Sequence, residues 1–132
     1  MAFNFQVRDC IVELTFHGKV TADDFRELMK LFQDLESRLP VSPDRISDLS
    51  DASLTELSSD DLVKFAASRG RATLKNKIKS AIIAPGPGQF GLSRMFMAYN
   101  HNPDIEIKIF KDSAGAYDWI GLEEKSVDKP NA

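Results

Sequence analysis

The sequence has few of the residues that disulfides and metal sites require. It contains one cysteine, Cys10, and two histidines, His17 and His101. A single thiol cannot form a disulfide within the chain, and neither histidine has a second ligand at a spacing typical of metal sites. We therefore expect no metal and no cofactor. The low cysteine content favours a reducing compartment, the cytoplasm.

Long hydrophobic runs and an excess of positive charge are also absent. No apolar run approaches the roughly 18 residues that span a bilayer. The first six residues have neither a basic leader nor an apolar segment, so we expect no secretory signal. The formal net charge is -3, whereas binding to nucleic-acid phosphates requires an excess of Lys and Arg. These features predict a cytoplasmic protein with no stable membrane insertion and no nucleic-acid partner.

Catalytic constellations are missing as well. The sequence has no nucleophile elbow, and its adjacent carboxylates Asp60 and Asp61 stand in the first turn of a predicted helix, where they suit the helix dipole. No residue can therefore be named for acid–base or nucleophilic catalysis. The sequence predicts a protein without enzymatic activity.

What the sequence does contain is the hydrophobic patterning of one α/β domain. A chain of 132 residues is long enough for one core, and we assign residues 1–122 to a single domain and residues 123–132 to a flexible tail. Alternating runs predict strands, and apolar stripes at helical spacing predict helices. The strands are expected at 3–7, 12–16, 45–50, 79–84 and 105–110, and the helices at 21–39, 59–70, 92–100 and 113–120. Thr21, paired with Asp24, is expected to cap the first helix, and Ser113 the last.

These elements follow one another in the order ββαβαβαβα. They predict an α/β fold with a single mixed, mostly parallel sheet, an N-terminal antiparallel hairpin and about four helices. Crossovers between parallel strands are expected to be right-handed. The alternation of Ile105, Ile107 and Ile109 with polar residues predicts that the last strand lies at an edge of the sheet.

A glycine-rich segment, residues 85–91, follows the predicted buried strand. Its GxGxxG spacing resembles the fingerprint of dinucleotide-binding folds, but Pro87 removes an amide that would face a pyrophosphate, and we reject that interpretation. A narrower hypothesis is a site for one phosphate or carboxylate at the start of the next helix. A tight turn with a purely structural role is the alternative, and it is the stronger of the two interpretations. The candidate residues for the anion are Gly88, Gly91, Ser93 and Arg94.

The helix after this segment suggests a second kind of site. Its apolar stripe and the neighbouring aromatic residue could line a pocket for an apolar ligand, with Arg94 binding an anionic head group. Packing of the same side chains in the core is the alternative. The candidate lining residues are Phe90, Met95, Phe96 and Tyr99.

Polar residues at the end of the strand 45–50 and in the loop after it form a third group. Asp48, Ser50 and Asp51 lie at the carboxyl end of a strand, where open α/β sheets usually place ligands. Ser58 or Ser59 can cap the next helix, and capping explains them without any function. The alternative is a surface for a protein partner.

Taken together, five segments of the chain resemble the SpoIIAA-like, or STAS-like, bacterial proteins. The resemblance covers nearly all of residues 9–122 and depends on the order and spacing of these segments. They are Val12–Thr21, Arg45–Ala52, Lys79–Ala84, Gly91–Phe96 and Ile109–Gly121.

The resemblance implies a fold shared by anti-sigma-factor antagonists and by CRAL-TRIO lipid-transfer domains. The antagonists carry a phosphorylatable serine in a turn that enters the helix after the central strand. In the corresponding region this chain has Ser58 and Ser59 but lacks the glycine of the family pattern. The acidic residues beside them would repel a phosphate.

Two functional hypotheses remain from the sequence. The first is a non-enzymatic regulatory or protein-interaction module, which binds another protein or a second copy of itself through the surface between Asp48 and Ser59. The alternative is a small binding domain for an apolar or anionic ligand, lipid-like or phosphorylated, at the helix that carries Arg94.

Overall fold

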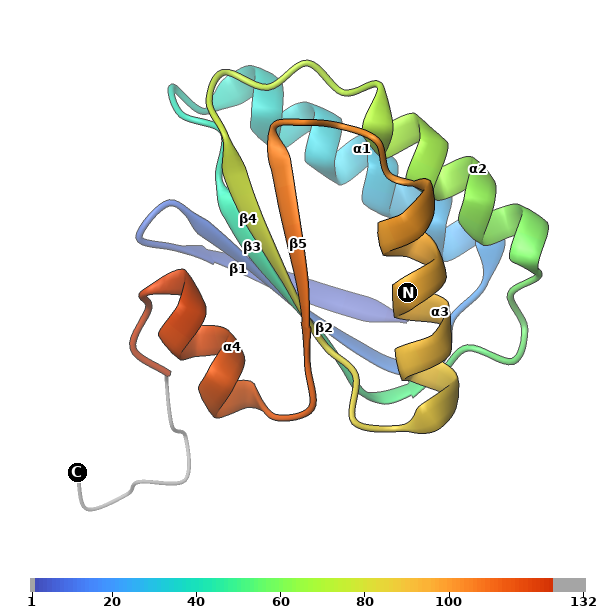
Figure 1. Ribbon diagram of the computed structural model, residues 1–132. Coiled ribbons are helices and arrows are strands. Elements are labelled where there is room, and N and C mark those ends of the chain that lie inside the picture. The colour runs from blue at the N-terminus through green and yellow to red at the C-terminus, as the bar shows by residue number, and fades with distance from the viewer. Residues whose placement is uncertain (1, 125–132) are drawn as a thin grey trace.

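A five-stranded sheet forms the centre of the part of the chain that the structure describes, residues 2–124 of a computed structural model (Figure 1). The strands lie in the order β1-β2-β3-β4-β5, with β1 and β2 antiparallel and the other pairs parallel. This arrangement confirms the predicted fold class, including the edge position of β5. The elements are β1 (Phe3–Arg8), β2 (Ile11–Lys19), α1 (Ala22–Arg38), β3 (Asp44–Ser53), α2 (Ser59–Gly70), β4 (Ile78–Ile83), α3 (Pro87–Tyr99), β5 (Ile105–Phe110) and α4 (Ser113–Ile120).

The helices divide between the two faces of the sheet. Each connection from β2 to β5 moves one strand further in the same direction, and right-handed crossovers of this kind place their helices on one face. Helices α1, α2 and α3 accordingly cover one face, and α4 covers the other (Figure 1). Of the predicted tail, residues 125–132 lie outside the described residues.

Two hydrophobic clusters, one on each face, hold the layers together. The larger cluster joins β2 to the crossover helices and includes Leu14, Phe16 and Phe32. The smaller one joins β3 and β4 to α4 and includes Ile46 and Ile83. Because side chains alternate between faces along a strand, a central strand covered on both sides reads as a continuous apolar run. This explains the apolar run from Ala81 to Ile83 in β4.

The helix starts follow capping chemistry, although two differ from the prediction. The expected pairing of Thr21 with Asp24 is present, because Asp24 Oδ2 accepts a hydrogen bond from Thr21 N at 2.8 Å. The fourth helix is capped by Asp112, whose Oδ1 accepts from Gly115 N at 2.8 Å, and not by Ser113. The third helix begins at Pro87, five residues before the predicted start at residue 92. Proline suits the first helical position because its missing N–H has no partner there anyway.

Candidate ligand-binding site

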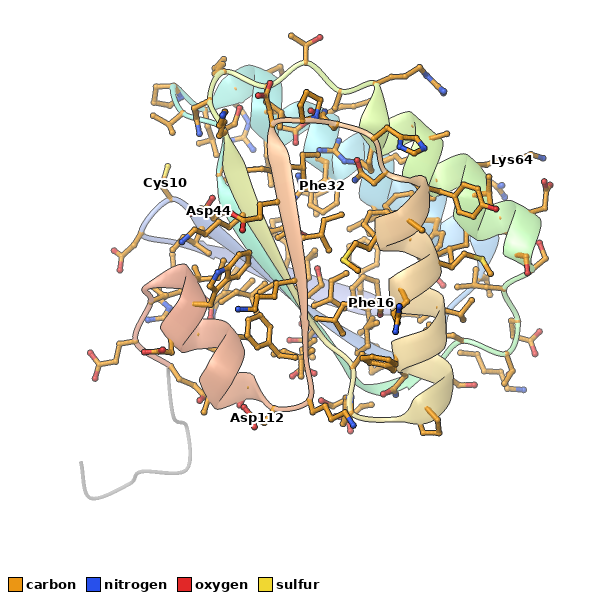
Figure 2. All side chains as sticks on the ribbon, viewed as in Figure 1. Cys10, Phe16, Phe32, Asp44, Lys64 and Asp112 are labelled. Carbon is orange, nitrogen blue, oxygen red and sulfur yellow. The ribbon has the colours of Figure 1, made fainter. Side chains whose placement is uncertain are left out.

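A cavity lies between the sheet and the three crossover helices. Its volume is about 80 Å³, and side chains from β2, β3, β4, the three helices and the loop before α2 form its walls. The lining is mainly leucine and phenylalanine, and Figure 2 shows two of the phenylalanines, Phe16 and Phe32, on this side of the sheet. Sites for small molecules usually have an apolar wall with a few polar groups. We therefore take this cavity as the candidate site.

Short polar side chains on the sheet explain why the space is not filled. In β3, Ile46 packs toward α4, whereas Arg45 and Ser47 line the cavity. Ser80 of β4 pairs in register with Arg45 and lines the cavity as well. The same face of β2 carries large apolar side chains that pack closely. The cavity thus lies where the sheet changes from bulky residues to serine.

One wall of the cavity holds a buried hydroxyl group without a partner. Ser93 of α3 is 4% exposed, and its Oγ makes no hydrogen bond to any residue that the structure describes. A buried polar group left unsatisfied costs about 1–3 kcal/mol, and native proteins contain few of them. A polar atom of a bound molecule would supply the missing partner.

A buried charge cluster borders the cavity at Arg45. Both carboxylate oxygens of Glu36, on α1, accept hydrogen bonds from Arg69 of α2. The contact between Glu36 Oε2 and Arg45 Nη2 is longer, at 3.6 Å, and Nη2 forms no hydrogen bond within the described chain. The guanidinium carbons of Arg45 and Arg69 lie 4.3 Å and 4.8 Å from the ring centre of Phe32. These cation–π contacts offset part of the cost of burying two cations.

The cluster contains two cations and one anion. Arg45 and Arg69 are 5% and 3% exposed, so water screens them little. Burial, together with repulsion from Arg69, lowers the pKa of Arg45 to about 9, and the guanidinium remains charged at pH 7. A buried cation without a full partner is unfavourable. The electrostatics of the cavity therefore favour a negative group beside Arg45.

Only part of the pocket predicted on α3 is found. Phe96 and Ser93 line the cavity, together with Leu92, whereas Phe90 and Met95 are half-buried outside it. Tyr99 is 47% exposed. The helix turns the face of Ser93 and Phe96 to the sheet, so one of the four predicted lining residues, Phe96, lies in the cavity.

The predicted anion site at the start of α3 is occupied by the chain itself. Gln89 Oε1 accepts a hydrogen bond from Gly86 N at 2.9 Å, and Gln89 Nε2 donates to the carbonyl of Ala52. Because the helix starts at Pro87, Ser93 and Arg94 lie in its second turn and not in its first. Gly88 and Gly91 are exposed helical residues outside the cavity. Arg94 is exposed and lies 5.8 Å from the ring centre of Phe90.

The predicted partner-surface residues fall into two separate groups. Asp48 Oδ1 accepts from Ser50 N and Ser50 Oγ at 2.9 Å and 2.6 Å, which closes a local turn, and Asp51 is exposed beside it. Ser58 caps α2 by accepting from Asp61 N at 3.0 Å. Ser59, the first residue of α2, is exposed. Among the described residues, no hydrogen bond joins the group of Asp48, Ser50 and Asp51 to the group of Ser58 and Ser59.

Sequence reasoning named Ser93 but missed the other polar residues of the cavity, Arg45, Ser47 and Ser80. Arg45 and Ser47 alternate with Ile46 in a strand that is covered on both faces. The sequence of this strand therefore already showed that one of its inward faces is polar. Glu36 follows Phe32 by four residues and so lies on the apolar stripe of α1. An acid on that stripe and an arginine on an inward strand position are the signals that could have found the cluster.

Within residues 2–124, no group of three or more His, Cys, Asp or Glu side chains is placed to hold a metal ion. None of the described helices combines the length and the apolar character needed to cross a membrane.

Comparison with known proteins supports the fold. No protein-family model matches the chain, and no curated protein matches it. A solved structure does: an uncharacterized protein of the DUF3478 family from Shewanella loihica PV-4, described as having a SpoIIAA-like fold. The two chains are 22% identical with a TM-score of 0.56, over 90% of this chain and 92% of the other. This chain has a SpoIIAA-like fold. At this identity the likeness concerns the fold alone, because one fold serves many functions.

Proposed function

We propose that the protein is a non-enzymatic binding domain that takes a small, mainly apolar molecule into the cavity between its sheet and helices α1–α3. The observation that supports this proposal is an apolar cavity in which two buried polar groups, Ser93 Oγ and Arg45 Nη2, have no partner in the described chain. Protein interiors are otherwise packed as densely as organic crystals. A space of this kind with free polar groups is suited to a ligand.

The loop between β3 and α2 provides a route into the cavity. Leu54 and Leu57 of this loop line the cavity and are half-buried, as are Phe25 and Phe96 at the helices. Half-buried side chains can change rotamer at lower cost than fully packed ones. We expect a ligand to enter by displacing these side chains.

The first test measures the mass of the purified protein under native and under denaturing conditions. The proposal expects extra mass in the native state that is lost on denaturing. Leu49→Phe places a larger side chain at the cavity wall and should abolish the extra mass. Ile11→Phe is the matched control, because Ile11 is a half-buried strand residue packed against the α4 cluster, and it should retain the ligand.

A second readout covers the case in which the ligand is lost during purification. Xenon is small enough for a cavity of this size, and it binds apolar protein cavities. Amide NMR spectra under xenon pressure should show saturable shifts around the cavity in the wild type and Ile11→Phe, but not in Leu49→Phe. If the native protein carries no extra mass and its amide NMR spectrum shows no saturable shift under xenon pressure, the proposal is refuted.

A regulatory or protein-interaction module is the second candidate function. The observation that favours it is that the loop before Ser58 also supplies Leu54 and Leu57 to the cavity, so an occupant would alter the surface that carries Ser58 and Ser59. Its test replaces Ser59 with Glu and Ser58 with Asn, which retains a capping side chain. Both variants should lose binding to a protein partner of the wild type. Unchanged binding of every partner would exclude this surface.

A further inference from the structure

We infer that the molecule bound in the cavity carries a single anionic group, a carboxylate or an equivalent monoanion, which pairs with Arg45. This inference depends on the binding function proposed above and names the class of ligand: a small monocarboxylic acid with an apolar body.

The first step is the charge balance of the buried cluster. Arg69 donates to both oxygens of Glu36 through Nη1 and Nη2, while its Nε has no hydrogen-bond partner in the described chain. Arg45 has only the 3.6 Å contact to Glu36, and its Nη2 is buried without a hydrogen-bond partner in the described chain. Asp44, the neighbouring acid in sequence, forms no ion pair with Arg45: it is the weakest of the influences on the pKa of Arg45, and its Oδ1 accepts a hydrogen bond from Lys79 N at 2.7 Å. One positive charge is therefore left to be matched, which fits a monoanion better than a dianion.

The second step is the geometry of the guanidinium. Its carbon lies 4.3 Å from the ring centre of Phe32, so the ring covers one side of the group. The N–H donors of arginine project in the plane of the guanidinium, where a carboxylate can accept two of them. Ring contacts and carboxylate contacts are compatible, because they use different directions.

The third step is the hydroxyl groups near the same wall. Ser80 lies beside Arg45 in the sheet register, and Ser47 is the next residue of β3 on the same face. Ser93 faces the cavity from α3 with its Oγ unsatisfied in the described chain. Hydroxyl groups can donate to a carboxylate oxygen. The rest of the lining is apolar and suits a hydrocarbon or aromatic body.

The size of the cavity limits the ligand. A volume of about 80 Å³ is well below the roughly 300 Å³ of pockets that hold drug-sized molecules. A long-chain lipid does not fit, and an acid of about six carbons fits only when the half-buried rim side chains move aside. The residue that binds the anionic head group is Arg45, which lines the cavity. Arg94 is exposed on α3 outside the cavity.

The test compares two ligands of equal shape, hexanoate and hexanamide, which differ in charge. Binding of each to the full chain is followed at pH 7 by amide NMR shifts. The wild type should bind hexanoate at least tenfold more tightly than hexanamide. In Arg45→Met, which leaves the Glu36–Arg69 pair intact, this preference should disappear while xenon and hexanamide still bind. Arg94→Met is the matched control and should keep the preference.

A measurement on the wild type alone covers the case in which Arg45→Met does not fold. Nuclear Overhauser contacts should join the methylene group next to the hexanoate carboxylate to the ring protons of Phe32. Equal affinity for hexanoate and hexanamide, an unchanged preference in a folded Arg45→Met, or contacts that place the carboxylate elsewhere would overturn the inference. In those outcomes the proposed binding function survives as long as hexanamide or xenon binds. If no probe binds at all, the proposed function itself fails.

Discussion

At the scale of single residues, Glu13 is the most strongly constrained acid on the α4 face of the sheet. Its carboxylate accepts hydrogen bonds from Tyr117 Oη at 2.7 Å, Arg8 Nε at 3.0 Å and Gln6 Nε2 at 3.2 Å. Burial alone would raise the pKa of Glu13, but the hydrogen bonds from Arg8 and Tyr117 outweigh it, and the pKa lies below its ordinary value. Burial and the bond to Glu13 in turn raise the pKa of Tyr117, which keeps its proton as a donor.

The lowered pKa of Glu13 makes the stability of the protein depend on pH. An acid whose pKa is lowered by folding stabilises the native state above its unfolded pKa, and that contribution is lost as the pH falls through the folded value. At pH 7, Glu13→Gln should therefore lower the free energy of unfolding by about 1–3 kcal/mol. The difference from the wild type should shrink below about pH 4.5. Urea unfolding between pH 3 and pH 7 measures it.

The control for this prediction is Glu106→Gln, an exposed position on the edge strand β5. Its stability curve should run parallel to that of the wild type over the same pH range. Parallel curves for Glu13→Gln as well would show that its carboxylate does not contribute through ionisation.

At the scale of elements, hydrophobic periodicity predicted every strand and helix, including β1, whose Phe5 and Val7 are 46% and 43% exposed. It predicted less well where a helix begins, since that depends on which side chain closes the first turn. Ser113 and Asp112 both have capping oxygens, and only the geometry shows that Asp112 accepts from Gly115. Pro87 starts α3 inside a segment whose glycines predict a turn.

The hairpin between β1 and β2 shows a second limit of the pattern. Asp9 and Cys10 link the strands with φ values of 52° and 62°, the left-handed region that two-residue hairpin turns require. Asparagine and glycine are the usual residues there, and Cys10 gives no such signal. The alternation of apolar residues on either side was sufficient to predict the hairpin, although the buried face belongs to β2, with Val12, Leu14 and Phe16, and not to β1.

The candidate site was predictable only in part for a related reason. Sequence patterns identify side chains that face inward, but they do not show where these side chains are too short to contact one another and leave a cavity. The space between β3, β4 and α3 exists because Ser47, Ser80 and Ser93 come together from three elements that are far apart in the sequence. The exposed glycines and Arg94 offered a more visible motif, and the structure places them outside the cavity.

At the scale of the whole molecule, the two faces of the sheet differ in how fully they are packed. The α4 face joins Ile46, Ala81 and Ile83 to the helix in a continuous buried cluster. The other face carries a larger cluster that contains the cavity and its unsatisfied groups. Stability is thus reduced on the face where we propose that the ligand binds, as is common at functional sites.

The substitution Ser93→Ala tests separately how the Ser93 hydroxyl affects the stability of the protein and its binding of a ligand in the cavity. Without ligand, the variant should be more stable than the wild type by about 1 kcal/mol, because it removes a buried hydroxyl that lacks a partner. A ligand that binds only the folded state adds stability that grows with its affinity. In saturating hexanoate the stability of the wild type should therefore increase more than that of Ser93→Ala. The stability advantage of Ser93→Ala should narrow or reverse. Thermal unfolding with and without hexanoate measures both effects, with Ser59→Ala on the exposed start of α2 as the control. A Ser93→Ala variant that is less stable than the wild type without ligand would show that the hydroxyl is satisfied in solution.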